Sequence, residues 1–107
     1  MRASDCVLEL GSGYSHFINN VQAEYRIAID SWPEFLDYLA PGIEGHVGDA
    51  REINSIKDRS VNFALASNLV EHLTQEAFGR LLDQLKHKLA PAGLLAHLQP
   101  NYRYEPI

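Results

Sequence analysis

Two glycines that follow a short apolar run are the part of this sequence best suited to chemistry. Gly11 and Gly13 come directly after residues 7–10, and a helix-like segment begins just beyond them. A strand that turns through glycines into a helix is typical of a nucleotide-type cofactor site, although a lone pair of glycines can also simply permit a tight turn. Glu9 precedes the first glycine by two residues, where a carboxylate repels a pyrophosphate and favours a ligand that carries positive charge.

Polar side chains follow the predicted strands at residues 6–10, 25–29, 45–47 and 61–66. Asp30 follows the second strand, Asp49 the third, and the residues after the fourth include Ser67, Asn68 and His72. Because the ligand of a doubly wound sheet binds outside the carboxyl ends of the strands, these side chains are expected at one edge. Taken singly, Asp49 and Asn68 are better explained as turn or cap residues, and Asp30 is equally suited to capping a helix. Together they favour a site, since Asp30 also lies near the offset of about 20 residues expected of a ribose-binding carboxylate.

The identity of the ligand depends on the residues around the glycines. A dinucleotide site asks for a third glycine at position 16, where this chain has His16, and nothing in the loop is basic. NAD is therefore disfavoured, and an NAD-type oxidoreductase is the weakest alternative. S-adenosylmethionine meets both conditions, because its sulfonium and ammonium are positive and its ribose offers a diol to Asp30. Its adenine amino group is a donor for Asp49.

The same segments resemble the successive motifs of class I S-adenosylmethionine-dependent methyltransferases. They occur in order along nearly the whole chain, at residues 9–13, 28–30, 48–50, 63–73 and 89–93. The resemblance implies contacts to the methionine end from Glu9, Gly11 and Gly13, to the ribose from Asp30, to the adenine from Ser31, Trp32, Asp49 and Ala50, and to the methionine amino group from Ser67 or Asn68, with Tyr14 flanking the cofactor.

The resemblance also places His72 close to the transferred methyl group. An imidazole titrates near neutrality, so His72 is the candidate general base, and a role in ordering its loop is an equal alternative. The chain departs from the family at Ser15, where a third glycine is common, and at Ser12, where many members have other small residues. Both side chains are small enough to leave cofactor binding possible.

Members of that family usually have a helix before the first strand and two further strands after the fifth. This sequence starts its first strand within a few residues of Met1 and stops soon after its fifth. It therefore resembles a methyltransferase truncated after the fifth strand, or a very minimal one, acting on an acceptor that the sequence does not identify. The alternative is a noncatalytic cofactor-binding or assembly module. The fifth strand, expected at residues 94–98, would lack its usual neighbour, and an exposed apolar edge predicts a dimer or larger homo-oligomer.

The predicted strands and helices that position these residues alternate along the sequence. They predict an α/β fold, a doubly wound and mainly parallel sheet of about five strands with helices on both faces. A short helix is expected around Phe17 and Ile18, and Ser31 with Glu34 has the spacing of a capping box that begins a second. The clearest helix covers residues 74–89, where leucines and a phenylalanine follow the i, i+3, i+4, i+7 pattern. Pro91 and Gly93 are expected to end it.

Composition limits the class of protein. The 107 residues, 46% hydrophobic, predict one domain over residues 1–107, and a formal charge of −5 argues against nonspecific binding to nucleic acid. No apolar run approaches the about 20 residues that span a bilayer, and no leader segment is visible, so we expect a cytoplasmic protein without a membrane partner. Cys6, the single cysteine, is expected in the core, and the histidines show no metal-ligand spacing.

Overall fold

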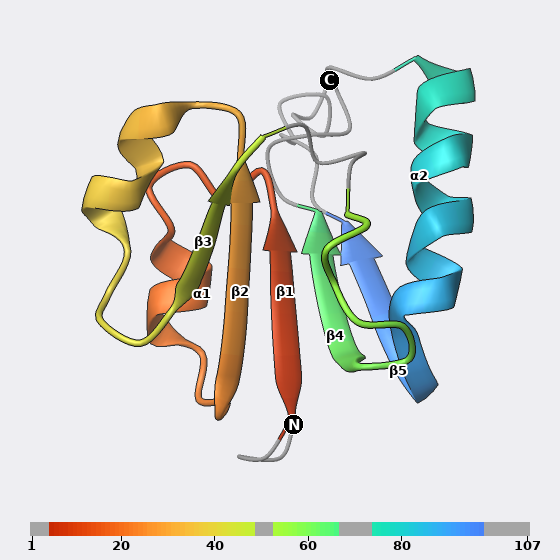
Figure 1. Cartoon of the computed structure of the whole chain (residues 1–107), viewed down its shortest axis with the longest axis horizontal. Coiled ribbons are helices and arrows are strands. Elements are labelled where there is room, and N and C mark those ends of the chain that lie inside the picture. Colours follow the sequence, from red (N-terminus) through yellow and green to blue (C-terminus); the bar gives the residue numbers. More distant parts are fainter. Residues whose placement is uncertain (1–4, 49–52, 67–73, 98–107) are drawn as a thin grey trace, which may run out of the picture.

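The computed structural model describes residues 5–48, 53–66 and 74–97. Its five strands form one sheet in the order β3-β2-β1-β4-β5, and every neighbouring pair is parallel (Figure 1). This confirms the predicted α/β fold with a parallel sheet. The elements are, in chain order, β1 (Cys6–Leu10), α1 (His16–Asn20), β2 (Tyr25–Asp30), η1 (Pro33–Tyr38), β3 (Glu44–Val47), β4 (Val61–Ala66), α2 (Gln75–Lys88) and β5 (Leu89–His97).

Helices cover both faces of the sheet, as the sequence predicts. β1 lies in the middle and all of its residues are buried, so its alternate side chains enter two different cores. Val7 packs with Ile18 of α1 and Phe35 of η1 on one face. On the other face, the cluster that contains Leu8 also contains side chains from α2 and from the segment before β4, namely Ile53, Ile56, Leu81 and Leu85. The sheet is therefore doubly wound around β1.

α2 is the longest helix of the described residues and confirms the clearest sequence prediction. Its N-cap is Thr74, whose side-chain oxygen accepts from the backbone N–H of Ala77 at 3.0 Å. Leu81 and Leu85, one turn apart, are 0% and 1% exposed and face the sheet. In the last turn the Lys88 ammonium donates to Asp58 at 2.8 Å, which joins the helix to the loop before β4.

The second predicted helix is a 3-10 helix, η1, and its predicted capping box is wrong. The N-cap is Trp32, not Ser31, and no side chain caps it. The reason lies in the neighbouring carboxylate, because Asp30 Oδ1 accepts the backbone N–H of Trp32 at 2.8 Å. At the far end Asn19 of α1 holds the chain, donating from Nδ2 to the Tyr38 carbonyl at 2.7 Å and accepting the Ala40 N–H at 2.8 Å. Contacts to β2 and α1 thus fix this segment.

β5 begins earlier than expected, directly after α2 at Leu89, and the predicted break at Pro91 and Gly93 lies inside the strand. The pairing with β4 shifts register between Val61 and Phe63, and Ala92 has a φ of 64°. A Cβ at Gly93 would lie 2.9 Å from the Val61 carbonyl oxygen. Gly93 is therefore required by a bulge between two close backbones.

Candidate functional site

The turn after β1 is held in a left-handed conformation and tied to β2. Gly11 has a φ of 70° and Gly13 a φ of 52°, values that glycine adopts without strain. The backbone N–H groups of Gly11 and Ser12 both donate to the Ile29 carbonyl, at 2.7 and 3.3 Å. The predicted glycine turn therefore exists and lies at the carboxyl ends of the two central strands β1 and β2.

Ser15, which stands where a third glycine is common, also has a positive φ, of 67°. It is the N-cap residue of α1 and is 1% exposed. Its backbone N–H donates to the Ser12 carbonyl at 2.7 Å, and its hydroxyl lies 3.1 Å from the Ser12 hydroxyl. The two serines that depart from the family pattern thus contact each other and close the turn, at the cost of a left-handed residue with a side chain.

Asp30 joins the glycine turn to the start of η1. Its Oδ2 accepts the backbone N–H of Gly13 at 2.7 Å, and its Oδ1 accepts that of Trp32 at 2.8 Å. The structure therefore brings together three of the predicted cofactor-binding residues. A carboxylate oxygen can accept more than one hydrogen bond, so the half-buried Asp30 retains acceptor capacity for a diol.

Glu9 is buried at 3% exposure beneath this turn. Its Oε1 accepts the backbone N–H of Ile18, in the first turn of α1, at 3.2 Å. A carboxylate at this position satisfies an N–H that has no partner within the helix and complements the positive end of the helix. Glu9 thus positions α1 against β1, a role that the sequence spacing alone does not indicate.

Three aromatic side chains form a cluster beside the turn. The Tyr14 ring stands edge-on to Trp32 and Tyr38, with centroid distances of 5.4 and 4.9 Å, and Trp32 stacks on Tyr38 at 5.7 Å. Tyr14 is 57% and Tyr38 45% exposed. Sequence reasoning selected Tyr14 and Trp32 but missed Tyr38, because only the path of η1, fixed by Asn19, brings it to this edge.

Other predicted site residues cannot be placed. Asp49, Ala50, Ser67, Asn68 and His72 lie outside the described residues. Within residues 5–48, 53–66 and 74–97, no group of three His, Cys, Asp or Glu side chains is arranged to hold a metal ion. In the same part of the chain no helix has the length and apolar character needed to cross a membrane.

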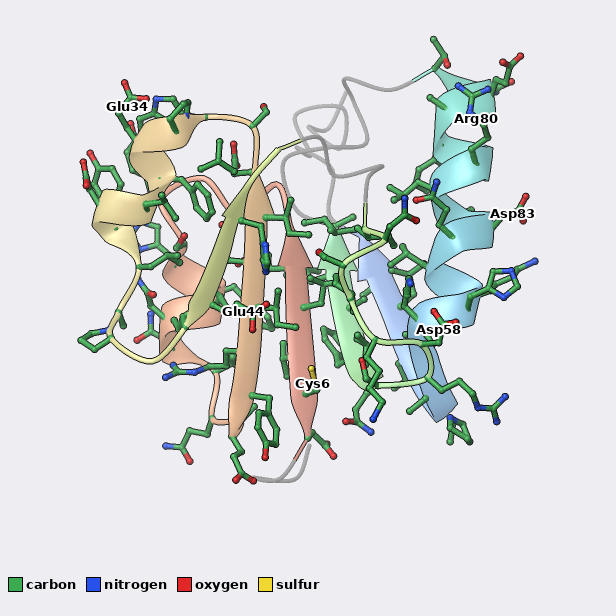
Figure 2. The ribbon with its side chains drawn as sticks, viewed as in Figure 1. Cys6, Glu34, Glu44, Asp58, Arg80 and Asp83 are labelled. Carbon is green, nitrogen blue, oxygen red and sulfur yellow. The ribbon has the colours of Figure 1, made fainter. Side chains whose placement is uncertain are left out.

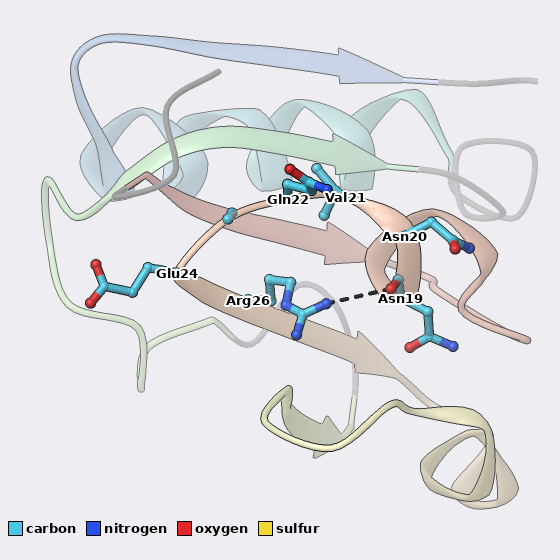
Figure 3. A pocket seen from close by; sticks show the side chains of 7 residues that line it. Asn19, Asn20, Val21, Gln22, Glu24 and Arg26 are labelled. Carbon is cyan, nitrogen blue, oxygen red and sulfur yellow. Dashed lines mark hydrogen bonds between the residues drawn. The ribbon is translucent and has the colours of Figure 1, made fainter.

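A cavity of about 710 Å³ lies at the opposite end of the sheet from the glycine turn (Figure 3). It is lined by the loop between α1 and β2, and Arg26 at its wall donates to the Ile18 and Asn19 carbonyls at 3.4 and 3.5 Å. Arg26 thereby satisfies the carbonyl end of α1. The cavity is remote from the carboxyl ends of the strands, where an open α/β sheet binds its ligand.

Known proteins match this chain in fold but not in sequence. No family model matches the sequence, and no curated protein does. Solved structures do match. One is a phosphoethanolamine N-methyltransferase of Haemonchus contortus in complex with phosphoethanolamine and S-adenosylhomocysteine, with a TM-score of 0.78, 17% identity, and coverage of 89% of this chain and 22% of that one. The chain has the fold of S-adenosylmethionine-dependent methyltransferases.

Two further structures share this methyltransferase fold. An S-adenosylmethionine-dependent methyltransferase of Mesorhizobium loti matches with a TM-score of 0.75 and 19% identity, over 89% of this chain and 47% of that one. A TehB-like methyltransferase of Corynebacterium glutamicum gives the same TM-score of 0.75 and 19% identity, over 89% and 54%. The chain thus spans from 22% to 54% of the length of these three proteins.

Proposed function

We propose that this protein is an S-adenosylmethionine-dependent methyltransferase, with an acceptor that neither the described residues nor the fold defines. The observation that carries the proposal is the double hydrogen bond of Asp30 to Gly13 and Trp32. It places a glycine turn, a carboxylate and an exposed aromatic surface together at the carboxyl ends of parallel strands. That edge is the ligand site of open α/β sheets.

The residues present fit this cofactor. Backbone groups of Gly11 and Gly13 would hold its methionine end, Asp30 would accept the ribose diol, and Tyr14 and Trp32 would flank the adenine. The cofactor supplies an electrophilic methyl group on a positively charged sulfonium. The protein's own contribution is then to align the acceptor with that methyl group and to exclude water.

The charges near the turn support a ligand without phosphate. Residues 9–32 contain Glu9 and Asp30 at the turn, and their single Lys or Arg is Arg26. Arg26 donates to the carboxy-terminal carbonyls of α1, away from the glycine turn. A pyrophosphate would therefore meet two carboxylates and no cationic partner from this segment, whereas a sulfonium and an ammonium would be stabilised.

Ser31 and residues outside the described ranges complete the proposal. We assign adenine contacts to Ser31, Asp49 and Ala50, and the methionine amino group to Ser67 or Asn68. His72 is proposed as the general base for a protonated acceptor, because its imidazole takes a proton near neutral pH. These assignments rest on the family resemblance of the sequence.

Trp32 provides a direct test, since it is the chain's single tryptophan. Titration with S-adenosylhomocysteine is expected to change its fluorescence saturably, and Asp30→Asn is expected to weaken binding by about tenfold or more through loss of a charge-assisted hydrogen bond. Asp37→Asn, at a carboxylate on the exposed side of η1, is the matched control and should bind like wild type. Saturable binding of NADH without binding of S-adenosylhomocysteine would overturn the proposal in favour of an oxidoreductase.

Cofactor binding and methyl transfer are separate claims. Formation of S-adenosylhomocysteine from S-adenosylmethionine, in the presence of candidate acceptors and dependent on the folded protein, would establish transfer. Binding of the cofactor with no turnover across acceptor classes would instead favour the alternative, a noncatalytic cofactor-binding or assembly module with the same fold.

We also propose that two copies associate through β5. Within the described sheet β5 pairs on one side only, with β4, and Leu94 is 65% exposed next to Phe63 in the β4 register. An apolar strand at a sheet edge is prone to pair with another strand. Sedimentation should show a dimer or larger assembly that Leu94→Lys shifts toward monomer, whereas a wild-type monomer at high concentration would contradict this.

A further inference from the structure

A second cavity, of about 530 Å³, opens at the amino ends of the strands, on the face of the sheet that carries α2. Its floor is formed by Cys6 of β1, Ile27 of β2 and Asn62 of β4, and Tyr25 and Glu44 extend it along β2 and β3. The volume lies within the range of small-molecule sites, about 300–1,000 Å³. Because Cys6 and Tyr25 begin their strands and Gly11 follows the end of β1, this cavity and the glycine turn lie at opposite edges of the sheet.

The cavity lining carries charges of both signs, from Glu24, Arg26, Glu44 and Lys57. Glu24 is exposed and Arg26 donates to the carbonyl end of α1, so Glu44 and Lys57 are the charges considered for a ligand. Glu44 stands on β3, and Lys57 stands on the loop that leads into β4. In the sheet, β2 and β1 lie between β3 and β4. Figure 2 shows Cys6 and Glu44 on the same face of the sheet. The Glu44 carboxylate and burial together raise the pKa of the Cys6 thiol, with burial the larger cause.

The polar groups that face a ligand differ on the two sides. Asn62 Oδ1 accepts the backbone N–H of Cys6 at 2.8 Å, which fixes the amide and leaves its Nδ2 as the donor available to a ligand. Lys57 makes no ion pair within residues 5–48, 53–66 and 74–97. Donors thus gather on the β4 side. On the β3 side, Glu44 Oε2 contacts His46 Nε2 at 2.5 Å, which leaves Oε1 as the acceptor available to a ligand. Ile27 and Tyr25 of β2 lie between the two sides.

We propose that this cavity binds a small zwitterion of the amino-acid class with an apolar or aromatic side chain. The carboxylate of the ligand would lie toward Lys57 and Asn62, its ammonium toward Glu44, and its side chain against Ile27 and Tyr25. Each charged end then gains a charge-assisted hydrogen bond, and the apolar part leaves water. The site is separate from the proposed cofactor edge and does not depend on it.

Titration of the ¹⁵N-labelled chain with L-phenylalanine, followed by backbone amide NMR, tests the proposal. Saturable shifts are expected at Cys6, Ile27 and Glu44, with none at Gly11 or Gly13. 3-Phenylpropionate, which lacks the ammonium, and phenethylamine, which lacks the carboxylate, should each bind about tenfold or more weaker, because each loses one charge-assisted hydrogen bond.

Variants assign the two ends of the ligand. Glu44→Gln should weaken binding of L-phenylalanine and phenethylamine but leave that of 3-phenylpropionate unchanged. Lys57→Met should weaken binding of L-phenylalanine and 3-phenylpropionate but leave that of phenethylamine unchanged. Glu34→Gln and Lys86→Met remove the same charges from exposed positions elsewhere and should change nothing. The same spectra report whether each variant is folded.

Three results would overturn the proposal. They are absence of saturable shifts at about 10 mM L-phenylalanine, a concentration that detects even millimolar affinity, equal affinity for the three ligands, and shifts confined to the glycine turn. Binding of S-adenosylhomocysteine is read from different amides, those of Gly11, Gly13 and Trp32. Failure of one proposal is therefore distinguishable from failure of the other.

Discussion

Replacing Asp30 with alanine should destabilise the fold as well as weaken cofactor binding. Its carboxylate accepts two backbone N–H groups, from Gly13 at 2.7 Å and from Trp32 at 2.8 Å. A hydrogen bond to a charged group contributes about 1.5–3 kcal/mol. Because Asp30 is half-buried, water replaces part of the loss, and we expect the free energy of unfolding to fall by about 2–4 kcal/mol. Urea unfolding followed by circular dichroism measures this loss.

A second substitution at the same position separates charge from hydrogen bonding. Asp30→Asn keeps one oxygen but presents an NH₂ group to the other backbone N–H, so it can satisfy only one of the two donors. It should therefore also be destabilised, whereas Asp37→Ala on exposed η1 should unfold like wild type. If Asp30→Ala were as stable as Asp37→Ala, Asp30 would not hold the turn and the account of the site would fail.

Three further predictions concern the elements around the site. Ser15→Gly should be more stable than Ser15→Ala by about 1 kcal/mol, since alanine keeps a side chain at a φ of 67°, and equal urea midpoints would contradict this. Leu81→Ala should lower the free energy of unfolding by about 2–5 kcal/mol, whereas Leu36→Ala, at a side chain 46% exposed, should change it little. Burial and Glu44 raise the pKa of the folded Cys6 thiol, so the folded chain holds a proton that the unfolded chain loses first. Stability should therefore fall as pH rises from the ordinary cysteine pKa to the raised one, and less steeply in Cys6→Ala; identical slopes in urea unfolding would refute this.

The central strands and α2 could be predicted from the sequence because each has a strong local pattern. β4 is an apolar run interrupted by Asn62 alone, and α2 has a stripe of leucines, and these patterns arise from burial in the core. The glycine turn and Asp30 were expected at one edge of the sheet, because they stand at the carboxyl ends of the neighbouring parallel strands β1 and β2. A local apolar pattern predicts an element correctly where burial of that element's own residues determines its structure.

The remaining features depend on contacts between distant residues. Asn19 binds the backbone at both Tyr38 and Ala40, and this contact determines the course of η1. Glu9 accepts an N–H from α1, a contact to Ile18 that its position before the glycines does not indicate. Gly93 is required by the close approach of Val61 across two strands. None of these partners is adjacent in the sequence, and propensity therefore carries no signal of them.

A crystal structure of the protein with S-adenosylhomocysteine would show whether the glycine turn and Asp30 form the cofactor site. We expect the ligand at the carboxyl ends of β1 and β2, with ribose hydroxyls within hydrogen-bond distance of the Asp30 carboxylate and the amino-acid end against Gly11 and Gly13. A ligand bound away from Asp30, or crystals of folded protein that bind none at saturating concentration, would contradict this expectation.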